Sequence, residues 1–280
     1  MDATQTNAIN PSYAGHTVHH LHKEKPCAHA HQSQDAFSMI ILVAGATGAT
    51  GRLLVAQLLD RGHSVKAIAR SPDSLPESIR YHERLTIVHA SLLDLTDTEL
   101  AQHVQGCTAV ASCLGHTLNF KGIYGNPRRL VTDATIRLCK AIHSNNPDTT
   151  TKFVLMNTAG NSNRDLHEPI SFAEKCVIGL VRLLLPPHAD NEQAADYLRT
   201  GIGQNDKAIQ WAVVRPDTLI NADQVTEYEV HPSPIRSAIF NPGTTSRINV
   251  AHFMADLITN NDTWNDWKGK MPVIYNRAVF

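Results

Sequence analysis

Residues 40–52 read Ile40-Ile-Leu-Val-Ala-Gly45-Ala-Thr-Gly48-Ala-Thr-Gly51-Arg52. An apolar run over 39–44, typical of a buried parallel strand, leads directly into three glycines and then into an amphipathic helix. Gly45 is expected to make the tight turn off the strand, Gly48 to let the backbone approach a pyrophosphate, and Gly51 to let the helix lie close to the sheet. The spacing G-x-x-G-x-x-G in this strand–loop–helix context predicts a loop whose amides hold the pyrophosphate of NAD(P).

The rest of the chain alternates between strand and helix patterns. Strands are expected at 39–44, 64–69, 85–90, 108–114, 151–157 and 209–214, with a short one at 227–231 and a late edge strand at 271–275. Helices are expected at 48–62, 96–104, 127–144 and 248–259, and over much of 171–200. This alternation predicts βαβ units. We therefore expect an α/β fold of the Rossmann type, a doubly wound parallel sheet forming a single domain over 39–280.

The tip of the second strand indicates which dinucleotide binds. An acid at this tip binds the ribose 2′-hydroxyl of NAD, whereas an arginine accommodates the 2′-phosphate of NADP. The strand over 64–69 is followed by Arg70 and carries no acid at its tip, and Arg52 at the start of the first helix is placed to assist. NADP(H) is therefore favoured over NAD(H), the alternative being that Arg70 is a solvated loop charge. Asp94, after the third strand, is expected either to accept the adenine amino group or to cap the next helix.

Polar side chains also follow the later strands. Ligands of such folds lie outside the carboxyl ends of the strands. Asn157, Thr158 and Asp217 are expected there, Asp217 relaying a proton if burial raises its pKa. The competing interpretations are strand-end hydrogen bonding for the first two and a turn residue for Asp217. His116 is more often a surface or capping residue than a catalyst. The expected catalytic residues are Thr158 and Asp217, and the expected cofactor-binding residues are Gly45, Thr47, Gly48, Ala49, Thr50, Gly51, Arg52, Arg70, Asp94, Leu114, Gly115, Asn157, Thr158 and Pro216.

These residues resemble the atypical short-chain dehydrogenase/reductase group, which includes NmrA-like proteins. The resemblance covers about 39–276 and rests on the 45–52 loop, Arg70, Asp94, the Val214-Arg215-Pro216 strand end and Ser246-Arg-Ile-Asn-Val-Ala-His252-Phe. Within the group the chain is most similar to NADPH-dependent flavin/biliverdin-IXβ reductase. The resemblance implies an NAD(P)H-dependent reductase of a small or aromatic acceptor, such as a flavin or a quinone-like compound.

Two departures from the wider group bear on mechanism. The Tyr-x-x-x-Lys pair used by most short-chain dehydrogenases is absent where tested, since Tyr81, Tyr124 and Tyr197 are not followed by lysine at the fourth position. The flavin reductase subgroup also lacks this pair, and Thr158 matches the place of its serine after the fifth strand. Asp217 stands where that subgroup has a histidine, which puts biliverdin-type chemistry in doubt. A non-catalytic, NADP-binding sensor of the NmrA-like kind is therefore the alternative to a reductase.

Composition sets the broad class. The chain has 280 residues, 42% of them hydrophobic, and a formal net charge of −1, so nothing suggests binding to nucleic acid or a membrane surface. Its five cysteines are scattered without a C-x-x-C pair, which indicates a reducing compartment and favours a cytoplasmic location. We expect a small-molecule substrate, a monomer or weak homodimer, and no metal site in the domain. Segments 161–190 and 217–247 are expected to contact the substrate.

Residues 1–38 differ from the remainder. They carry six of the sixteen histidines and show no helical or strand period: His16, His19, His20, His22, His29 and His31. A disordered tail is favoured. There are two alternatives: the segment is a metal-binding tract, or the native chain starts at Met39.

Overall fold

The computed structural model describes residues 38–117, 119–166, 168 and 171–277. The expectations for the histidine-rich segment 1–37 therefore lie outside the described residues. From Ser38 onward the chain forms one compact unit. No described helix is both long and apolar enough to cross a membrane.

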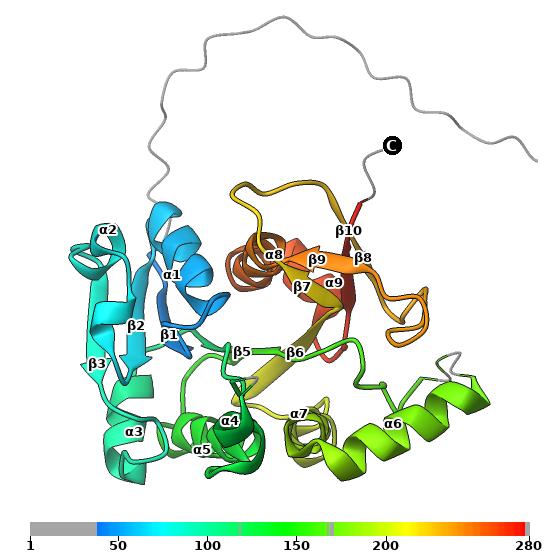
Figure 1. The fold of residues 1–280 in the computed structure, drawn as a ribbon. Helices are drawn as coiled ribbons and strands as arrows, with labels where there is room; N and C mark the ends of the chain where they lie inside the picture. Colours follow the sequence, from blue (N-terminus) through cyan, green and yellow to red (C-terminus); the bar gives the residue numbers. More distant parts are fainter. Residues whose placement is uncertain (1–37, 118, 167, 169–170, 278–280) are drawn as a thin grey trace, which may run out of the picture. The chain divides into compact units, whose positions relative to one another are not determined.

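A mostly parallel sheet lies at the centre of this unit (Figure 1). Within the described residues its strands follow the order β3-β2-β1-β4-β5-β6-β10-β8, and the β10–β8 pair alone is antiparallel. This is the Rossmann arrangement that the alternating pattern predicts. The strands are β1 (Ile40–Ala44), β2 (Ser64–Ala69), β3 (Leu85–His89), β4 (Ala109–Ser112), β5 (Thr151–Met156), β6 (Ile209–Pro216), β8 (Tyr228–His231) and β10 (Val273–Asn276), with a small separate pair of β7 (Thr218–Ile220) and β9 (Thr244–Ser246).

Helices cover both faces of the sheet (Figure 1). Ile41 and Val43 of β1 face α1 and α8, whereas Leu42 and Ala44 face α3 and α5, so β1 is buried on both sides. This explains its continuous apolar run. The helices are α1 (Gly51–Asp60), α2 (Glu77–Arg80), α3 (Asp97–Val104), α4 (Phe120–Tyr124), α5 (Leu130–Ser144), α6 (Phe172–Leu184), α7 (Pro186–Asp196), α8 (Arg247–Thr259) and α9 (Asn261–Trp267), with short turns at Pro72–Ser74 and Tyr197–Ile202.

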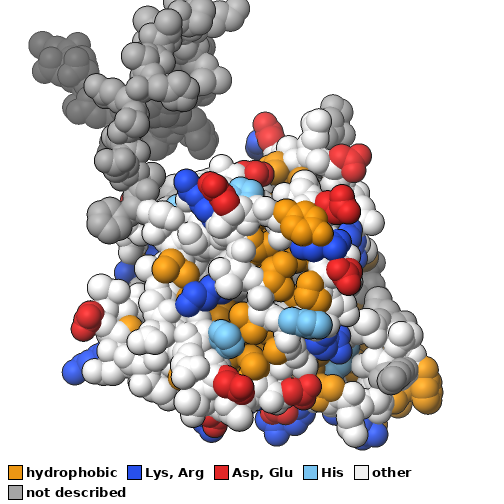
Figure 2. Space-filling model, turned by 90° about the vertical axis from the view of Figure 1, so that its left-hand side faces the viewer, with side chains coloured by type: hydrophobic (Ala, Val, Ile, Leu, Met, Phe, Trp, Pro, Cys, Tyr) orange, Lys and Arg blue, Asp and Glu red, His pale blue; other side chains and the backbone are white. Residues whose placement is uncertain are grey.

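Two sequence expectations need correction. The late strand is not at the edge, because β8 turns back and pairs antiparallel with β10, placing Tyr275 opposite Glu229. The first helix begins at Gly51 rather than at 48, because the Gly48 amide donates to the Gly45 carbonyl at 3.0 Å and closes a turn instead. On the face shown in Figure 2, acidic and basic side chains are interspersed and hydrophobic side chains gather near the centre.

Arg215, near the end of β6, is a fully buried cation that joins three segments. Its guanidinium donates to Glu168 at 2.7 and 3.3 Å, and the Glu168 side chain is only 2% exposed. It also donates to the carbonyl oxygens of Asn161 (2.7 Å), Pro232 (3.3 Å) and Met271 (2.7 Å). The loop after β5, the loop after β8 and the entry to β10 are therefore held at one point.

Replacing Arg215 should strongly destabilise the domain. Arg215→Met leaves the Glu168 carboxylate buried without a counter-charge, so the free energy of unfolding should fall by about 3–5 kcal/mol in urea titrations. The control is Arg277→Met, which removes exposed pairs with Glu227 and Glu229 and should cost less than about 1 kcal/mol. Equal losses in the two variants would contradict this role for Arg215.

A second ion cluster joins α6 to α7. Arg182 donates to both carboxylate oxygens of Glu192, at 2.6 and 2.8 Å, and the Nε2 atom of His188 lies 3.4 Å from Glu192 Oε1. The Glu192 side chain is 7% exposed. Burial opposes its ionisation, but hydrogen bonds from His188 and Arg182 outweigh that effect and lower the pKa of Glu192 to about 2. The charged cluster thus fixes the first turns of α7 against α6.

The lowered pKa of Glu192 makes stability depend on pH in the acid range. A carboxyl group whose folded pKa lies below its ordinary value of 4.5 contributes its full stabilisation above that value and loses it as the pH falls towards 2. The contribution is about 3 kcal/mol. Urea titrations between pH 6 and 2.5 should therefore show a shallower decline for Glu192→Gln than for wild type, with Glu227→Gln as an exposed control. Parallel curves for Glu192→Gln and wild type would refute this contribution of Glu192 to stability in the acid range.

Candidate functional site

Two glycines of the loop, Gly45 and Gly51, are packed so tightly that a side chain cannot be added at either position. Gly45 has a φ of +75°, and a Cβ there would lie 2.7–2.8 Å from backbone atoms of Cys113 and Leu114. A Cβ on Gly51 would collide with the carbonyl oxygen of Gly45. The β1–α1 turn is therefore pressed against the end of β4 and against the start of its own helix. Gly48, by contrast, is exposed, as a close approach to a ligand requires.

The amino end of α1 is open to a ligand. Thr50 precedes the helix and makes no side-chain capping hydrogen bond. The first-turn amides of a helix lack partners within the helix, and their partial positive charge attracts phosphate. The loop and helix start thus fit the pyrophosphate of a dinucleotide. Ala49, Thr50, Gly51 and Arg52 all belong to this loop and first turn.

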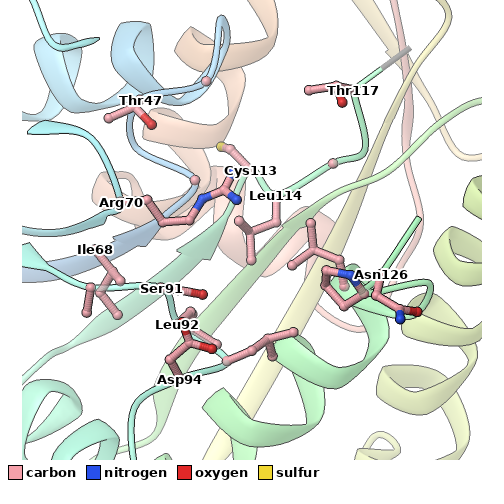
Figure 3. A pocket seen from close by; sticks show the side chains of 17 residues that line it. Thr47, Ile68, Arg70, Ser91, Leu92, Asp94, Cys113, Leu114, Thr117 and Asn126 are labelled. Atoms are coloured by element: carbon pink, nitrogen blue, oxygen red, sulfur yellow. The ribbon is translucent and has the colours of Figure 1, made fainter. Parts of the chain in front are cut away.

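A pocket of about 430 Å³ lies beside this loop, at the carboxyl ends of β1, β2, β3 and β4 (Figure 3). It brings together seven of the residues expected to bind the cofactor: Gly45, Thr47, Gly48, Arg70, Asp94, Leu114 and Gly115. Its remaining lining was not foreseen from the sequence and is formed by Ile68, Ala90, Ser91, Leu92, Leu93, Cys113, Thr117, Asn126, Pro127 and Leu130. Ser91–Leu93 directly follow a predicted strand, so their position could have been inferred, whereas Asn126 and Pro127 carry no such signal.

Arg70 and Asp94 provide the charge in this pocket. The Arg70 side chain extends from the end of β2 into the pocket (Figure 3), and no described residue forms a hydrogen bond or ion pair with its guanidinium. Asp94 is exposed and also lines the pocket. The capping alternative for Asp94 is wrong, because Thr96 caps α3 and forms a capping box with Glu99. Both charged groups are therefore available to a ligand.

Cys113 is not a reactive thiol, although it lines the pocket. Burial raises the pKa of Cys113 to about 12, so the thiol stays protonated at neutral pH. Among the described residues, no group of three or more His, Cys, Asp or Glu side chains is placed to hold a metal ion.

The expected residues after β5 and β6 lie outside the pocket lining. The buried Asn157 side chain donates to the carbonyl of Asn191 in α7 at 2.9 Å and accepts from the Thr158 amide at 2.9 Å. Its amide thus ties the end of β5 to α7. Thr158 is half-buried, and its hydroxyl accepts from the Gly160 amide at 3.3 Å.

Asp217, directly after Pro216 at the end of β6, holds a loop together. Its carboxylate accepts from the amides of Thr218 and Gly243, both at 2.8 Å. Burial raises its pKa, and the two backbone hydrogen bonds oppose that effect. These contacts give Asp217 the geometry of a turn residue that joins β7 to the segment before β9.

His116 links three elements and has no free ring nitrogen. Its Nε2 lies 2.7 Å from Asp190 in α7 and its Nδ1 lies 3.1 Å from the carbonyl of Gly122, and the side chain is 5% exposed. Asp190 also accepts from the amides of Val131 and Thr132 at the start of α5. These bonds anchor the loop after β4 and satisfy the first-turn amides of α5.

Adding a methyl group at Gly51 should lower the free energy of unfolding and abolish dinucleotide binding. Gly51→Ala forces the helix start away from the Gly45 carbonyl, which should cost about 1–3 kcal/mol of unfolding free energy. The Kd for NADPH, from nicotinamide fluorescence, should rise beyond the measurable range. The control is Gly179→Ala in α6, where an added Cβ meets open space and should be neutral or stabilise by up to about 1 kcal/mol. Wild-type binding by Gly51→Ala would exclude the proposed loop packing.

Comparison with solved structures shows the same fold in several proteins. A short-chain dehydrogenase/reductase from Veillonella parvula, solved in complex with NADP, shares 20% identity over 86% of this chain and 95% of its own, with a TM-score of 0.63. A candidate NADH-flavin reductase from Streptococcus pneumoniae shares 18% identity over 86% and 100%, with a TM-score of 0.59. An oxidoreductase from Lactococcus lactis shares 16% identity over 86% and 92%, with a TM-score of 0.61. At these identities the likeness shows the fold alone.

Comparison of sequences identifies the family to which the chain belongs. A search of curated proteins gave no significant match. The family model described as NAD(P)H-binding, however, matches residues 45–261, which include the glycine loop, the pocket-lining strand ends and α8. The expected NAD(P)-binding fold is thereby confirmed, and this chain belongs to the NAD(P)H-binding family.

Proposed function

We propose that the protein is an NADPH-dependent reductase of a small or aromatic acceptor. The observation that carries the cofactor preference is Arg70. Its guanidinium lies in the pocket at the end of β2, without a carboxylate partner among the described residues, where an NAD-binding site would present an acid. A planar guanidinium matches the oxygens of a 2′-phosphate.

The chain's own residues divide the binding work in this proposal. The amides of the 45–51 loop bind the pyrophosphate, Arg70 binds the 2′-phosphate, and Asp94 accepts the adenine amino group. Backbone at Leu114 and Gly115 leads towards the ends of β5 and β6, where Asn157, Thr158 and Pro216 lie. The reduced nicotinamide supplies the hydride, and the protein orients the reactants and excludes water.

The acceptor class is argued from the fold and from a missing catalytic pair. The chain shows a fold shared with a candidate NADH-flavin reductase, and the Tyr-x-x-x-Lys pair expected of an alcohol or ketone dehydrogenase is absent at Tyr81, Tyr124 and Tyr197. A flavin or quinone-like acceptor accepts hydride without that pair. The substrate segments 161–190 and 217–247 remain part of the proposal, and Arg215 and Asp217 hold both near the sheet.

Arg70→Ala should weaken NADPH binding far more than NADH binding. Loss of a charge-assisted contact to phosphate should raise the Kd for NADPH by roughly 10–100-fold, while the Kd for NADH changes by less than about threefold. Nicotinamide fluorescence titrations measure both constants. Arg277→Ala, an exposed arginine paired with Glu227, is the matched control and should change neither.

Turnover is then tested by adding FMN or dichlorophenolindophenol and following the nicotinamide absorbance. Acceptor-dependent oxidation supports the reductase. Tight NADPH binding with no oxidation by any acceptor would instead support an NADP-binding sensor. Equal affinity of the wild type for NADPH and NADH would overturn the assignment of Arg70.

A further inference from the structure

A histidine outside the expected residues lies beside Thr158. A Cβ added to Gly160 would be 3.5 Å from Cε1 and 4.0 Å from Nδ1 of His188, and 3.8 Å from the hydroxyl oxygen of Thr158. One edge of the imidazole and the threonine hydroxyl thus face the same point over Gly160. This point is at the carboxyl end of β5, next to β4, whose end lines the dinucleotide pocket. It is where the reacting end of a bound dinucleotide should arrive.

The imidazole is oriented by a carboxylate. Its Nε2 is buried and lies 3.4 Å from Oε1 of Glu192, and no closer partner exists among the described residues. The side chain as a whole is 13% exposed. Arg182 from α6 binds Glu192 at 2.6 and 2.8 Å, and Arg164 approaches it at 4.0 Å, so the carboxylate cannot rotate freely. With Nε2 on the side of Glu192, the Cε1–Nδ1 edge faces Gly160, and Nδ1 has no described hydrogen-bond partner.

The position of the histidine on its helix is also secured. The Asn157 side chain donates to the carbonyl of Asn191, and Asp190 accepts from the amides of Val131 and Thr132. These bonds hold α7 against both β5 and α5. A general acid needs a stable place within reach of the proton acceptor, and this arrangement supplies one.

We propose that His188 is a catalytic residue, the acid that protonates the acceptor while Thr158 holds it by a hydrogen bond. This role rests on the proposed reductase function. For a quinone-like acceptor, the hydride with its electron pair comes from the reduced nicotinamide and forms one new bond to the acceptor. The displaced π electrons move to the acceptor oxygen, which takes the proton from Nδ1 of the imidazolium. Neutral His188 and the oxidised nicotinamide remain, and solvent returns the proton to His188.

Glu192 is a positioning residue in this scheme. Its carboxylate lies 3.4 Å from Nε2 and so holds the ring in the orientation that turns the opposite edge towards Gly160. Within the described part of the chain, the charged groups beside this His188–Glu192 pair are Arg182 from α6 and Arg164 from the loop after β5.

The test uses the full chain with NADPH and dichlorophenolindophenol. His188→Gln keeps a hydrogen-bonding side chain but cannot donate the catalytic proton, so kcat should fall by about 100-fold or more. The Kd for NADPH should stay within about threefold of wild type. Wild-type kcat should decline with rising pH because the acid is lost, and the His188→Gln profile should lack this decline.

Two further variants keep the result interpretable. His143→Gln removes another histidine–carboxylate pair, with Asp206 at 2.9 Å, near the end of α5, and should leave kcat and its pH profile unchanged. Gly160→Ala places a methyl group at ordinary contact distance from His188 and Thr158, so the protein should fold while KM for the acceptor rises. This second variant probes the same space without altering the histidine.

The outcomes separate this role from the reductase proposal. If the wild type oxidises NADPH and His188→Gln matches it in kcat and in pH profile, the role of His188 is overturned and the reductase function stands. If the wild type oxidises no NADPH, both are overturned. A large fall in kcat with an unchanged Kd and a flattened pH profile supports His188 as the acid.

Discussion

The backbone contact between the β1–α1 turn and the end of β4 is the constraint around which the nucleotide half of the molecule is organised. Gly45 touches the peptide of Cys113 and Leu114, and Gly51 touches Gly45, with no room for a Cβ at either contact. Because β1 pairs with β2 on one side and β4 on the other, this is the point at which the sheet order reverses. The pocket forms there because the carboxyl ends of β1 to β4 converge where the turn lies directly against the end of β4.

The other half of the same sheet edge is built differently. There the backbone segments are held by buried polar side chains: Arg215 with Glu168, Asn157 with Asn191, and Asp190 with His116. Such groups are costly to bury unless every donor and acceptor is matched, and in return they set a unique geometry. The half around the pocket thus depends on the absence of side chains at Gly45 and Gly51, and the half beside β5 and β6 on matched buried polar groups.

The two halves also differ in how their charged side chains are arranged. The pocket presents the Arg70 guanidinium, which no described residue pairs with, and the positive end of α1, which together suit a ligand carrying several phosphates. Towards β5 the charged groups are instead neutralised in pairs, as Arg182 is by Glu192. This arrangement suits the uncharged acceptor that we propose, and the Cε1–Nδ1 edge of His188 faces the same point over Gly160 as the Thr158 hydroxyl.

The sequence by itself determined the fold class, the glycine loop and the residues at the ends of the first four strands. It could do so because strand periodicity and the steric demand for glycine are local properties. Only the tertiary structure decided that Asp94 lines the pocket while Thr96 caps α3, that β8 lies outside β10, and that Asp217 holds its own loop. Arg215 pairs with Glu168, 47 positions away, and His188 and Thr158 converge on Gly160 from distant parts of the chain, and no local pattern specifies such meetings.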